Sequence, residues 1–415
     1  MVKNDRFDRD QKMIIILSMI AYSVLYFMRL NISLTFAGME RTFQVTPEEL
    51  GIVSSAFFWC YAFGQLIFGF LGDRLPARYM VFVGLLGSGI LNLSIGQVQS
   101  FAPIIFLWAF NGIFQSMLWS PIVKCVAKYF DGNKKVVASF MLSITQVIGY
   151  MLAWVGSYFI DRIAGWRFVF IVPSVIGIVF SLVWLVLFRY KSTGITEKRS
   201  KGTSLIRQPI LLGFLGVIAL FSTLFGLVKS SIDTWMPTMI SDIGNLPEEG
   251  IVITLFLIPL VNFFGIMLAK AMVKRLNGDI YKSILFVWGG AMLISLVSLI
   301  LFKASPLAFV IMIAVLFGFV YGQTPLFTSF IPLDFVKWDC VSTVTGFVDF
   351  AIYVGAGITG TVSGLILGDG NAKNWSALSI YWFILLAIGM VFSIITYLWH
   401  HKLRKKINRE EAEWD

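Results

Sequence analysis

Charged residues are scarce in this chain, where they make up 13% of 415 residues. A soluble globular chain carries about 25%, so the deficit, which runs along the whole length, excludes a soluble protein. Histidine and cysteine are scarce as well, with two and three residues. The histidines, His400 and His401, are adjacent and no cysteine pair has a CxxC spacing, which indicates neither a disulfide framework nor a metal site. A histidine-based hydrolase and a zinc enzyme are therefore excluded.

The chain is instead rich in long hydrophobic runs, and hydrophobic residues make up 58% of it. About 20 consecutive apolar residues cross a bilayer as a helix, and twelve such stretches can be recognised. They lie near 13–37, 47–71, 79–99, 102–127, 136–160, 166–188, 209–240, 250–273, 281–302, 306–332, 340–368 and 376–400. The sequence therefore predicts an all-α membrane protein with twelve transmembrane helices.

One polar and basic stretch, 189–208, divides these helices into two sets of six. We therefore expect a six-helix bundle over 1–188, a cytoplasmic linker over 189–208, a second six-helix bundle over 209–401 and a cytoplasmic tail over 402–415. Lysine and arginine concentrate in every second connection, starting with the N-terminal leader, and such residues favour the cytoplasmic side. Both termini are thus predicted in the cytoplasm, in a multi-pass protein of the cell (inner or plasma) membrane. The net charge of +10 is accordingly a sign of topology, and we expect no nucleic-acid partner.

The two halves are similar to each other in sequence. Arg29-Leu-Asn-Ile-Ser in the first helix lines up with Lys229-Ser-Ser-Ile-Asp in the seventh, at an offset of 200 residues. Repeated halves that hold a substrate between them near the middle of the membrane are typical of secondary transporters. No GxxxxGK(S/T) segment is present, so direct ATP drive has no visible site. We expect a gradient-driven transporter, not an enzyme, without a cofactor.

The connection between the second and third helices carries the run Gly69-Phe-Leu-Gly-Asp-Arg-Leu-Pro-Ala-Arg78. This run closely resembles the loop signature of the major facilitator superfamily. A carboxylate and two cations at such a junction can hold neighbouring helices in one conformation. The resemblance therefore implies a conformational latch formed by Asp73, Arg74 and Arg78, in a fold of two pseudo-symmetric six-helix bundles.

Further segments resemble the organophosphate:phosphate antiporter family: Tyr26-Phe-Met-Arg-Leu-Asn31, Asn111-Gly-Ile-Phe-Gln115, Trp119-Ser-Pro-Ile-Val-Lys124 and Trp235-Met-Pro-Thr238. That family includes glycerol-3-phosphate and glucose-6-phosphate transporters. The resemblance implies import of a phosphate ester in exchange for inorganic phosphate, by alternating access. Arg29 falls where the family has its helix-1 binding arginine, and Lys229 falls where its helix-7 arginine usually stands. Two departures are Gln65, where some members have a lysine, and Gln146, where one branch has a histidine.

Arg29 and Lys229 are predicted to lie deep in the membrane, where a charge costs about 2.5–3.5 kcal/mol. The planar donor fork of arginine suits a bidentate grip on phosphate or carboxylate, although an arginine paired with an internal acid is the alternative. Two cations facing each other repel in an empty site, so we expect a positively charged site that a small dianion stabilises. Polar and aromatic side chains of other helices are expected to line the same site: Tyr26, Gln65, Trp119, Gln146 and Tyr353.

Asp349 lies within the eleventh helix, and three roles are open for it. It could form an ion pair with Lys229 or Arg29 in the empty site and release it when substrate binds. It could instead bind a proton and couple transport to a proton gradient, or be a structural carboxylate that accepts hydrogen bonds from the backbone. Asp233, one turn after Lys229, could be the counter-ion of that lysine, although a position near the outer interface is favoured.

Three functions remain open. The leading one is a secondary active antiporter of an anionic organic solute, most simply a phosphate ester such as a sugar or glycerol phosphate. The alternative among transporters is a proton- or cation-coupled symporter of a carboxylate or sugar acid. The alternative of another class is a sugar-phosphate sensor with the transporter fold. We expect a monomer in the lipid bilayer, with inorganic phosphate or a proton as the coupling species of a transporter.

Overall fold

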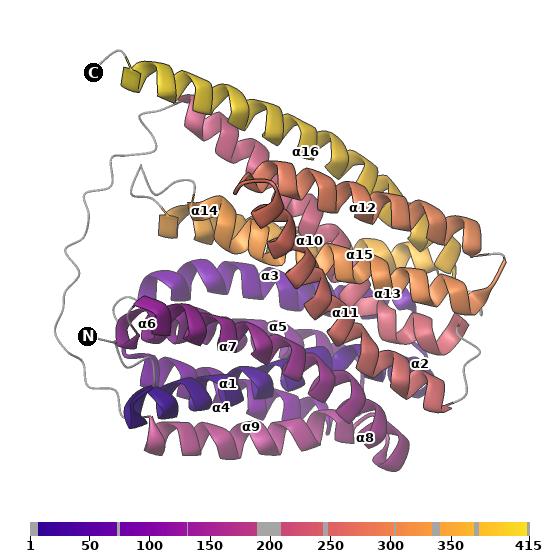
Figure 1. The fold of residues 1–415 in the computed structure, drawn as a ribbon. Coiled ribbons are helices and arrows are strands. Elements are labelled where there is room, and N and C mark those ends of the chain that lie inside the picture. The colour runs from indigo at the N-terminus through magenta and orange to yellow at the C-terminus, as the bar shows by residue number, and fades with distance from the viewer. Residues whose placement is uncertain are drawn as a thin grey trace.

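The computed structural model describes residues 7–72, 75–130, 132–188, 209–243, 248–302, 304–333, 341–368 and 373–412. Within these ranges the regular structure is helical and no strand occurs. Figure 1 shows the helices running roughly alongside one another in two groups, one built from the first half of the chain and one from the second. The predicted all-α membrane fold is therefore confirmed.

The helices of the first half are α1 (Arg9–Leu30), α2 (Ile32–Phe43), α3 (Pro47–Gly72), α4 (Ala77–Ile95), α5 (Ala102–Ser116), α6 (Trp119–Tyr129), α7 (Gly132–Met151), the π-helix η1 (Leu152–Gly156), α8 (Ser157–Ala164) and α9 (Phe168–Leu187). Those of the second half are α10 (Pro209–Ile243), α11 (Glu248–Arg275), α12 (Ile280–Leu301), α13 (Pro306–Gly322), the π-helix η3 (Leu326–Phe330), α14 (Ile331–Leu333), α15 (Val341–Leu367) and α16 (Trp375–Ala412). The last helix continues beyond His401, where the sequence predicts that a tail begins.

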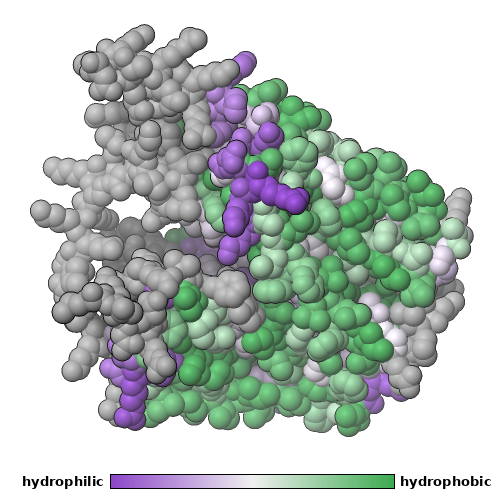
Figure 2. Space-filling model, viewed as in Figure 1, coloured by the Kyte–Doolittle hydropathy of each residue, from purple (hydrophilic) through white to green (hydrophobic). Residues whose placement is uncertain are grey.

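Eleven segments of the described chain are long and apolar enough to cross a membrane. The predicted span 136–160, which corresponds to α7, η1 and α8, is not among these eleven. Figure 2 shows a continuous hydrophobic surface along the flank of the bundle, with hydrophilic residues gathered toward the ends. Such a surface is expected where a protein faces the hydrocarbon core of a bilayer.

The first predicted span is interrupted at Asn31, between α1 and α2. The side-chain amide nitrogen of Asn31 donates hydrogen bonds to Asn92 Oδ1 at 3.0 Å and to the carbonyl oxygen of Val169 at 3.1 Å. These bonds join the junction of α1 and α2 to α4 and α9. The interruption places Arg29 in the last turn of α1, beside polar side chains of other helices.

The helices have two ends, which we call the terminal end, where α1 begins and α16 ends, and the distal end, where α2 and α10 end (Figure 1). At the distal end, ion pairs connect the two halves. Lys373 Nζ lies 3.0 Å from Glu40 Oε2 in the first half and 3.4 Å from Asp242 Oδ2 in the second. This three-residue cluster ties α2 to α10 and to the start of α16.

The two halves also touch closely along α3 and α15. A Cβ atom added to Gly51 of α3 would overlap the carbonyl oxygen of Gly360 on α15. One turn further along α3, the hydroxyl oxygens of Ser55 and Thr361 lie 2.8 Å apart. Small residues let helix backbones approach in this way, which is how transmembrane helices commonly pack.

Candidate functional site

A cavity of about 130 Å³ lies between the two halves. Side chains of α1, α2, α3, α5, α6 and α7 line it on one side, and side chains of α10, α13, η3 and α15 line it on the other. The structure brings together here all eight residues that the sequence predicts at the substrate: Tyr26, Arg29, Gln65, Trp119, Gln146, Lys229, Asp349 and Tyr353. Their common location is a matter of geometry, and their roles in binding stay predictions.

Arg29 is held by a side-chain hydrogen bond from the first half. Its Nε donates to Gln115 Oε1 at 2.8 Å, and Gln115 Nε2 in turn donates to the carbonyl oxygen of Met28 at 3.0 Å and to Ser88 Oγ at 3.1 Å. The Arg29 side chain is buried, yet its Nη2 has no hydrogen-bond partner among the described residues. A buried donor without a partner costs about 1–3 kcal/mol, and more when it is charged, so this nitrogen is poised for a ligand.

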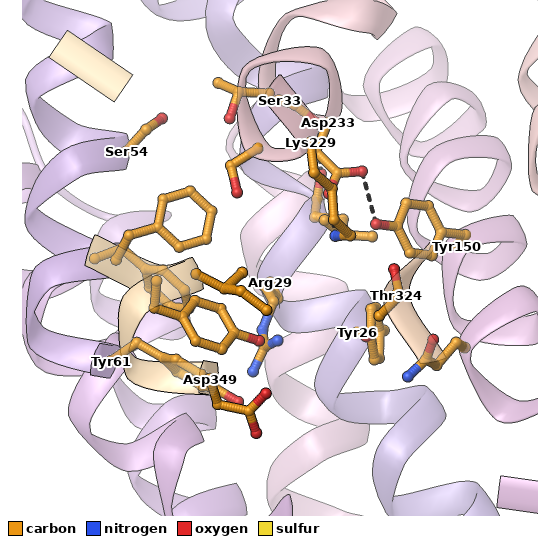
Figure 3. A pocket seen from close by; sticks show the side chains of 18 of the residues that line it. Tyr26, Arg29, Ser33, Ser54, Tyr61, Tyr150, Lys229, Asp233, Thr324 and Asp349 are labelled. Carbon is orange, nitrogen blue, oxygen red and sulfur yellow. Dashed lines mark hydrogen bonds and ion pairs between the residues drawn. The ribbon is translucent and has the colours of Figure 1, made fainter. Parts of the chain in front are cut away.

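Aromatic rings surround the same guanidinium group. Arg29 Cζ lies 4.5 Å from the ring centroid of Tyr61, 5.4 Å from that of Tyr26 and 5.7 Å from that of Phe57. Cation–π contacts of this kind stabilise a cation and restrict its motion. Figure 3 shows Arg29 lying between Tyr61 and Tyr26 in the cavity. The fork of donors is therefore fixed in direction before any ligand arrives.

Lys229 is paired within its own helix, which corrects two expectations. Its Nζ lies 2.8 Å from Asp233 Oδ2, and the hydroxyl group of Tyr150 donates to the other carboxylate oxygen of Asp233 at 2.7 Å (Figure 3). The favoured position of Asp233 near the outer interface is wrong, because this buried side chain lines the cavity. Lys229 is not a bare cation repelling Arg29, because its charge is compensated one turn away.

Two hydrogen bonds run from α7 across the cavity to the second half. Tyr150 reaches Asp233 on α10, and Tyr321 of α13 donates to Gln146 Oε1 at 2.8 Å. The Lys229 ammonium group also lies 4.9 Å from the ring centroid of Tyr321. The α7 helix therefore contacts the second half through the same side chains that surround Lys229.

Asp349 has neither of the partners that the sequence suggests. No described residue forms an ion pair or a hydrogen bond with it, although it lines the cavity and is half-buried. An ion pair to Lys229 or Arg29, one of the three roles left open for Asp349, is not formed among the described residues: Asp233 compensates Lys229 and Gln115 holds Arg29. A backbone-bonded structural carboxylate is not observed either among the described residues.

The remaining predicted side chains line the cavity through aromatic contacts. Gln65 Nε2 donates to the hydroxyl oxygen of Tyr61 at 2.7 Å, and the ring of Tyr61 lies 4.5 Å from that of Tyr353. The ring of Trp119 lies 4.8 Å from that of Tyr22. The cavity wall is therefore largely aromatic, with polar groups at a few points, as is usual for small-molecule sites.

The predicted latch is described only in part. Asp73 and Arg74 lie outside the described residues. Arg78 donates from Nε to the carbonyl oxygen of Leu185 at 2.8 Å, and the carbonyl oxygen of Arg78 accepts from Trp184 Nε1 at 3.1 Å. Both contacts join α4 to α9, so Arg78 connects two helices within the first half.

Sequence reasoning did not assign site roles to Gln115, Tyr150 and the amides behind Arg29. A signal for the amides was present in the sequence: Ser88 and Asn92 are one helical turn apart, and so are Asn111 and Gln115, in otherwise apolar runs. Residues i and i+4 share a helix face, and a polar face inside the membrane is expected to point into the protein. In the structure these faces meet at the carbonyl oxygen of Met28, which accepts from Asn92 and Asn111 at 3.3 Å each.

We expect the variant Gln115→Glu to lose anion binding while it remains folded. The new carboxylate would sit 2.8 Å from Arg29 Nε, where the amide oxygen now lies, and would neutralise the guanidinium group. Binding of the anion should weaken by at least about tenfold, since charge-assisted hydrogen bonds contribute about 1.5–3 kcal/mol each. Calorimetry on the purified variant measures this, with Gln97→Glu on the surface as the matched control. Unchanged affinity would show that a negative charge beside Arg29 Nε does not affect binding of the anion.

Comparison with known proteins shows which families this chain is similar to. A family model described as Major Facilitator Superfamily matches residues 18–360. The D-galactonate transporter of Escherichia coli O6:H1 is 26% identical over 181 residues, which cover 44% of this chain and 42% of that protein. The glycerol-3-phosphate transporter of Bacillus subtilis is 28% identical over 258 residues, which cover 56% and 58%. The chain thus spans about half the length of these curated relatives.

Solved structures show the same fold at low sequence identity. The crystal structure of a D-xylose–proton symporter has a TM-score of 0.76 and is 11% identical to this chain, covering 93% of it and 97% of the symporter. The expected resemblance to glycerol-phosphate transporters is thus matched by a relative of that name, beside one named for a sugar acid.

Proposed function

This chain belongs to the major facilitator superfamily, and on that premise we propose that it moves a phosphate ester across the cell membrane in exchange for inorganic phosphate. The chain is a transporter with a multi-pass membrane fold. The finer assignment, with both termini in the cytoplasm and alternating access between two halves, is our proposal. It is supported by the cavity between the halves and by the relative named for glycerol 3-phosphate.

The observation that carries the proposal is the unsatisfied donor of Arg29. Its guanidinium group is oriented by Gln115 and by aromatic rings, and Nη2 has no partner among the described residues. A tetrahedral phosphate presents several acceptor oxygens to such a fork, and the pairing is charge-assisted. Inorganic phosphate presents the same group as an ester does, so one site can take either in turn.

Lys229 supplies the second contact with the anion and couples binding to the two halves. When a phosphate oxygen approaches Nζ, it competes with Asp233, which lies 2.8 Å away and also accepts from Tyr150. A change in the position of Asp233 therefore alters the hydrogen bond between α7 and α10. Because only a ligand that interacts differently with two states can shift their balance, this contact is a physical route from binding to movement of the halves.

Exchange in proteoliposomes tests the proposal. Vesicles loaded with inorganic phosphate should take up external labelled glycerol 3-phosphate or glucose 6-phosphate, because the internal phosphate supplies the return substrate. Uptake should persist when ionophores remove the pH gradient and should vanish in vesicles without internal phosphate or ester. Protein-free vesicles and vesicles with Arg29→Gln are the controls. Uptake that ignores internal phosphate would contradict exchange.

A second candidate is proton-coupled symport of a sugar acid. Asp349 favours it, because a carboxylate that lines the cavity without a described partner is placed to bind a proton together with the substrate. The relative named for D-galactonate supports the same substrate class. In the vesicles above, accumulation of labelled galactonate driven by an imposed pH gradient, with no internal phosphate, would favour symport over exchange.

A further inference from the structure

The charges that face the cavity balance one another. Among the described residues, four charged side chains line it: the cations Arg29 and Lys229 and the carboxylates Asp233 and Asp349. With all four ionised, these charges sum to zero, whereas the sequence predicts a net positive site. Asp233 and Lys229 already satisfy each other at 2.8 Å. What faces a ligand without a described partner is one cationic donor, on Arg29, and one carboxylate, on Asp349.

A purely anionic ligand would pair with Arg29 and leave the carboxylate of Asp349 without a partner. Its phosphate would bind Arg29, but the carboxylate of Asp349 would remain unpaired in an enclosed site and would repel the ligand. An uncompensated charge in such surroundings is costly, and like charges placed together act against a ligand. A ligand with a phosphate at one end and a cation at the other removes both costs.

The surroundings of Asp349 suit an organic cation. Tyr353 lies one turn further along α15 and also lines the cavity, and its ring is 4.5 Å from that of Tyr61 and 6.4 Å from that of Phe58. Aromatic faces attract ammonium groups and exclude water from them. Figure 3 shows Asp349 on the same side of the cavity as Tyr61 and Arg29, away from the Tyr150–Asp233 hydrogen bond.

We propose that the preferred substrate is a zwitterionic phosphate ester, a small molecule with a phosphate group and a protonated amine. Arg29 and Lys229 bind the phosphate, and Asp349 binds the ammonium group beside Tyr353 and Tyr61. The proposal rests on the proposed phosphate-ester function and narrows it to one chemical class. Asp349 is then the residue that determines specificity, through a charge that selects for the amine.

Two matched pairs of ligands test this on the purified full chain. Glucosamine 6-phosphate and glucose 6-phosphate differ by an amino group in place of a hydroxyl group, and so do phosphoethanolamine and 2-hydroxyethyl phosphate. Calorimetry and ligand-induced rises in melting temperature should show at least tenfold tighter binding of the amine in one pair or both. The members of each pair differ in charge, and the two pairs differ in size. A preference for the amine can therefore be distinguished from a difference in fit to the cavity.

The variant Asp349→Asn keeps the shape of the side chain and removes its charge. It should lower the affinity for the amine to that for the matched hydroxyl compound, while Asp349→Glu should keep a preference. Asp161→Asn, the same change in a half-buried residue of α8 that does not line the cavity, should leave the preference intact.

The outcomes separate the two proposals. If neither member of any pair binds, the phosphate-ester function itself is wrong. If both members bind equally to the wild-type protein, the phosphate-ester function stands and the zwitterion proposal is overturned. This wild-type comparison decides the matter even if the asparagine variant does not fold. Equal gains for both members in Asp349→Asn would also overturn it, because the carboxylate would then act on the phosphate alone.

Discussion

Uptake of the phosphate ester by Arg29→Lys is expected to fall about a hundredfold, although the variant keeps the positive charge. Lysine lacks the planar fork, cannot donate to Gln115 in the same geometry, and stacks less well on Tyr61. Loss of two charge-assisted hydrogen bonds of about 1.5 kcal/mol each accounts for a change of this size. Initial rates of uptake into proteoliposomes, normalised to inserted protein, measure it.

A matched control exists in Arg167, which also lies against an aromatic ring but outside the cavity. Its Cζ is 4.6 Å from the ring centroid of Trp166, and its Nη2 donates to the carbonyl oxygen of Val98 at 3.4 Å. Arg167→Lys should transport at close to the wild-type rate. Wild-type uptake by Arg29→Lys would mean that a point charge suffices and that bidentate recognition is the wrong account.

Lys229→Gln is expected to lower both stability and transport, and the two effects can be separated. Removing one partner of a largely buried ion pair destabilises a protein by about 3–5 kcal/mol, because the remaining charge is uncompensated. Asp233 would keep only its hydrogen bond from Tyr150. The double variant Lys229→Gln, Asp233→Asn removes both charges, so its melting temperature in detergent should recover most of the loss.

Transport should not recover with stability. The double variant still lacks the ammonium group that we propose contacts the phosphate. Its uptake should therefore stay at least about tenfold below the wild-type rate, which corresponds to the loss of one charge-assisted contact. Recovery of transport together with melting temperature would assign Lys229 a structural role only. A double variant no more stable than Lys229→Gln would mean that the loss of stability does not come from an uncompensated charge on Asp233.

Much of the architecture could be predicted from hydropathy, because a bilayer demands long apolar helices and leaves few alternatives. The interruption at Asn31 could not be read from periodicity. The partners of Asn31, which are Asn92 and Val169, are distant in sequence and meet it only in the folded bundle. The π-helices η1 and η3 likewise follow from packing, since nothing in the local spacing marks them.

The candidate site was predictable as a set of residues but not as a pattern of partners. Arg29, Lys229 and Asp349 stand out because charge is rare in apolar runs. Which charges compensate one another is decided by side-chain direction. Asp233 lies against Lys229 one turn away, and Asp349 has no partner in the part of the chain that the structure describes. That difference changes the expected ligand from a dianion to a zwitterion.

The contact between Gly51 and Gly360 has a practical consequence for experiments. The helix backbones meet there at small residues, and the contact beside them is the pair of hydroxyl groups of Ser55 and Thr361. A bulky residue at either position would act as a wedge that keeps the distal end apart. Gly360→Leu is therefore a means of trapping a conformer in which α3 and α15 are separated at the distal end, for structure determination or for raising conformation-specific antibodies, with the cavity residues left untouched.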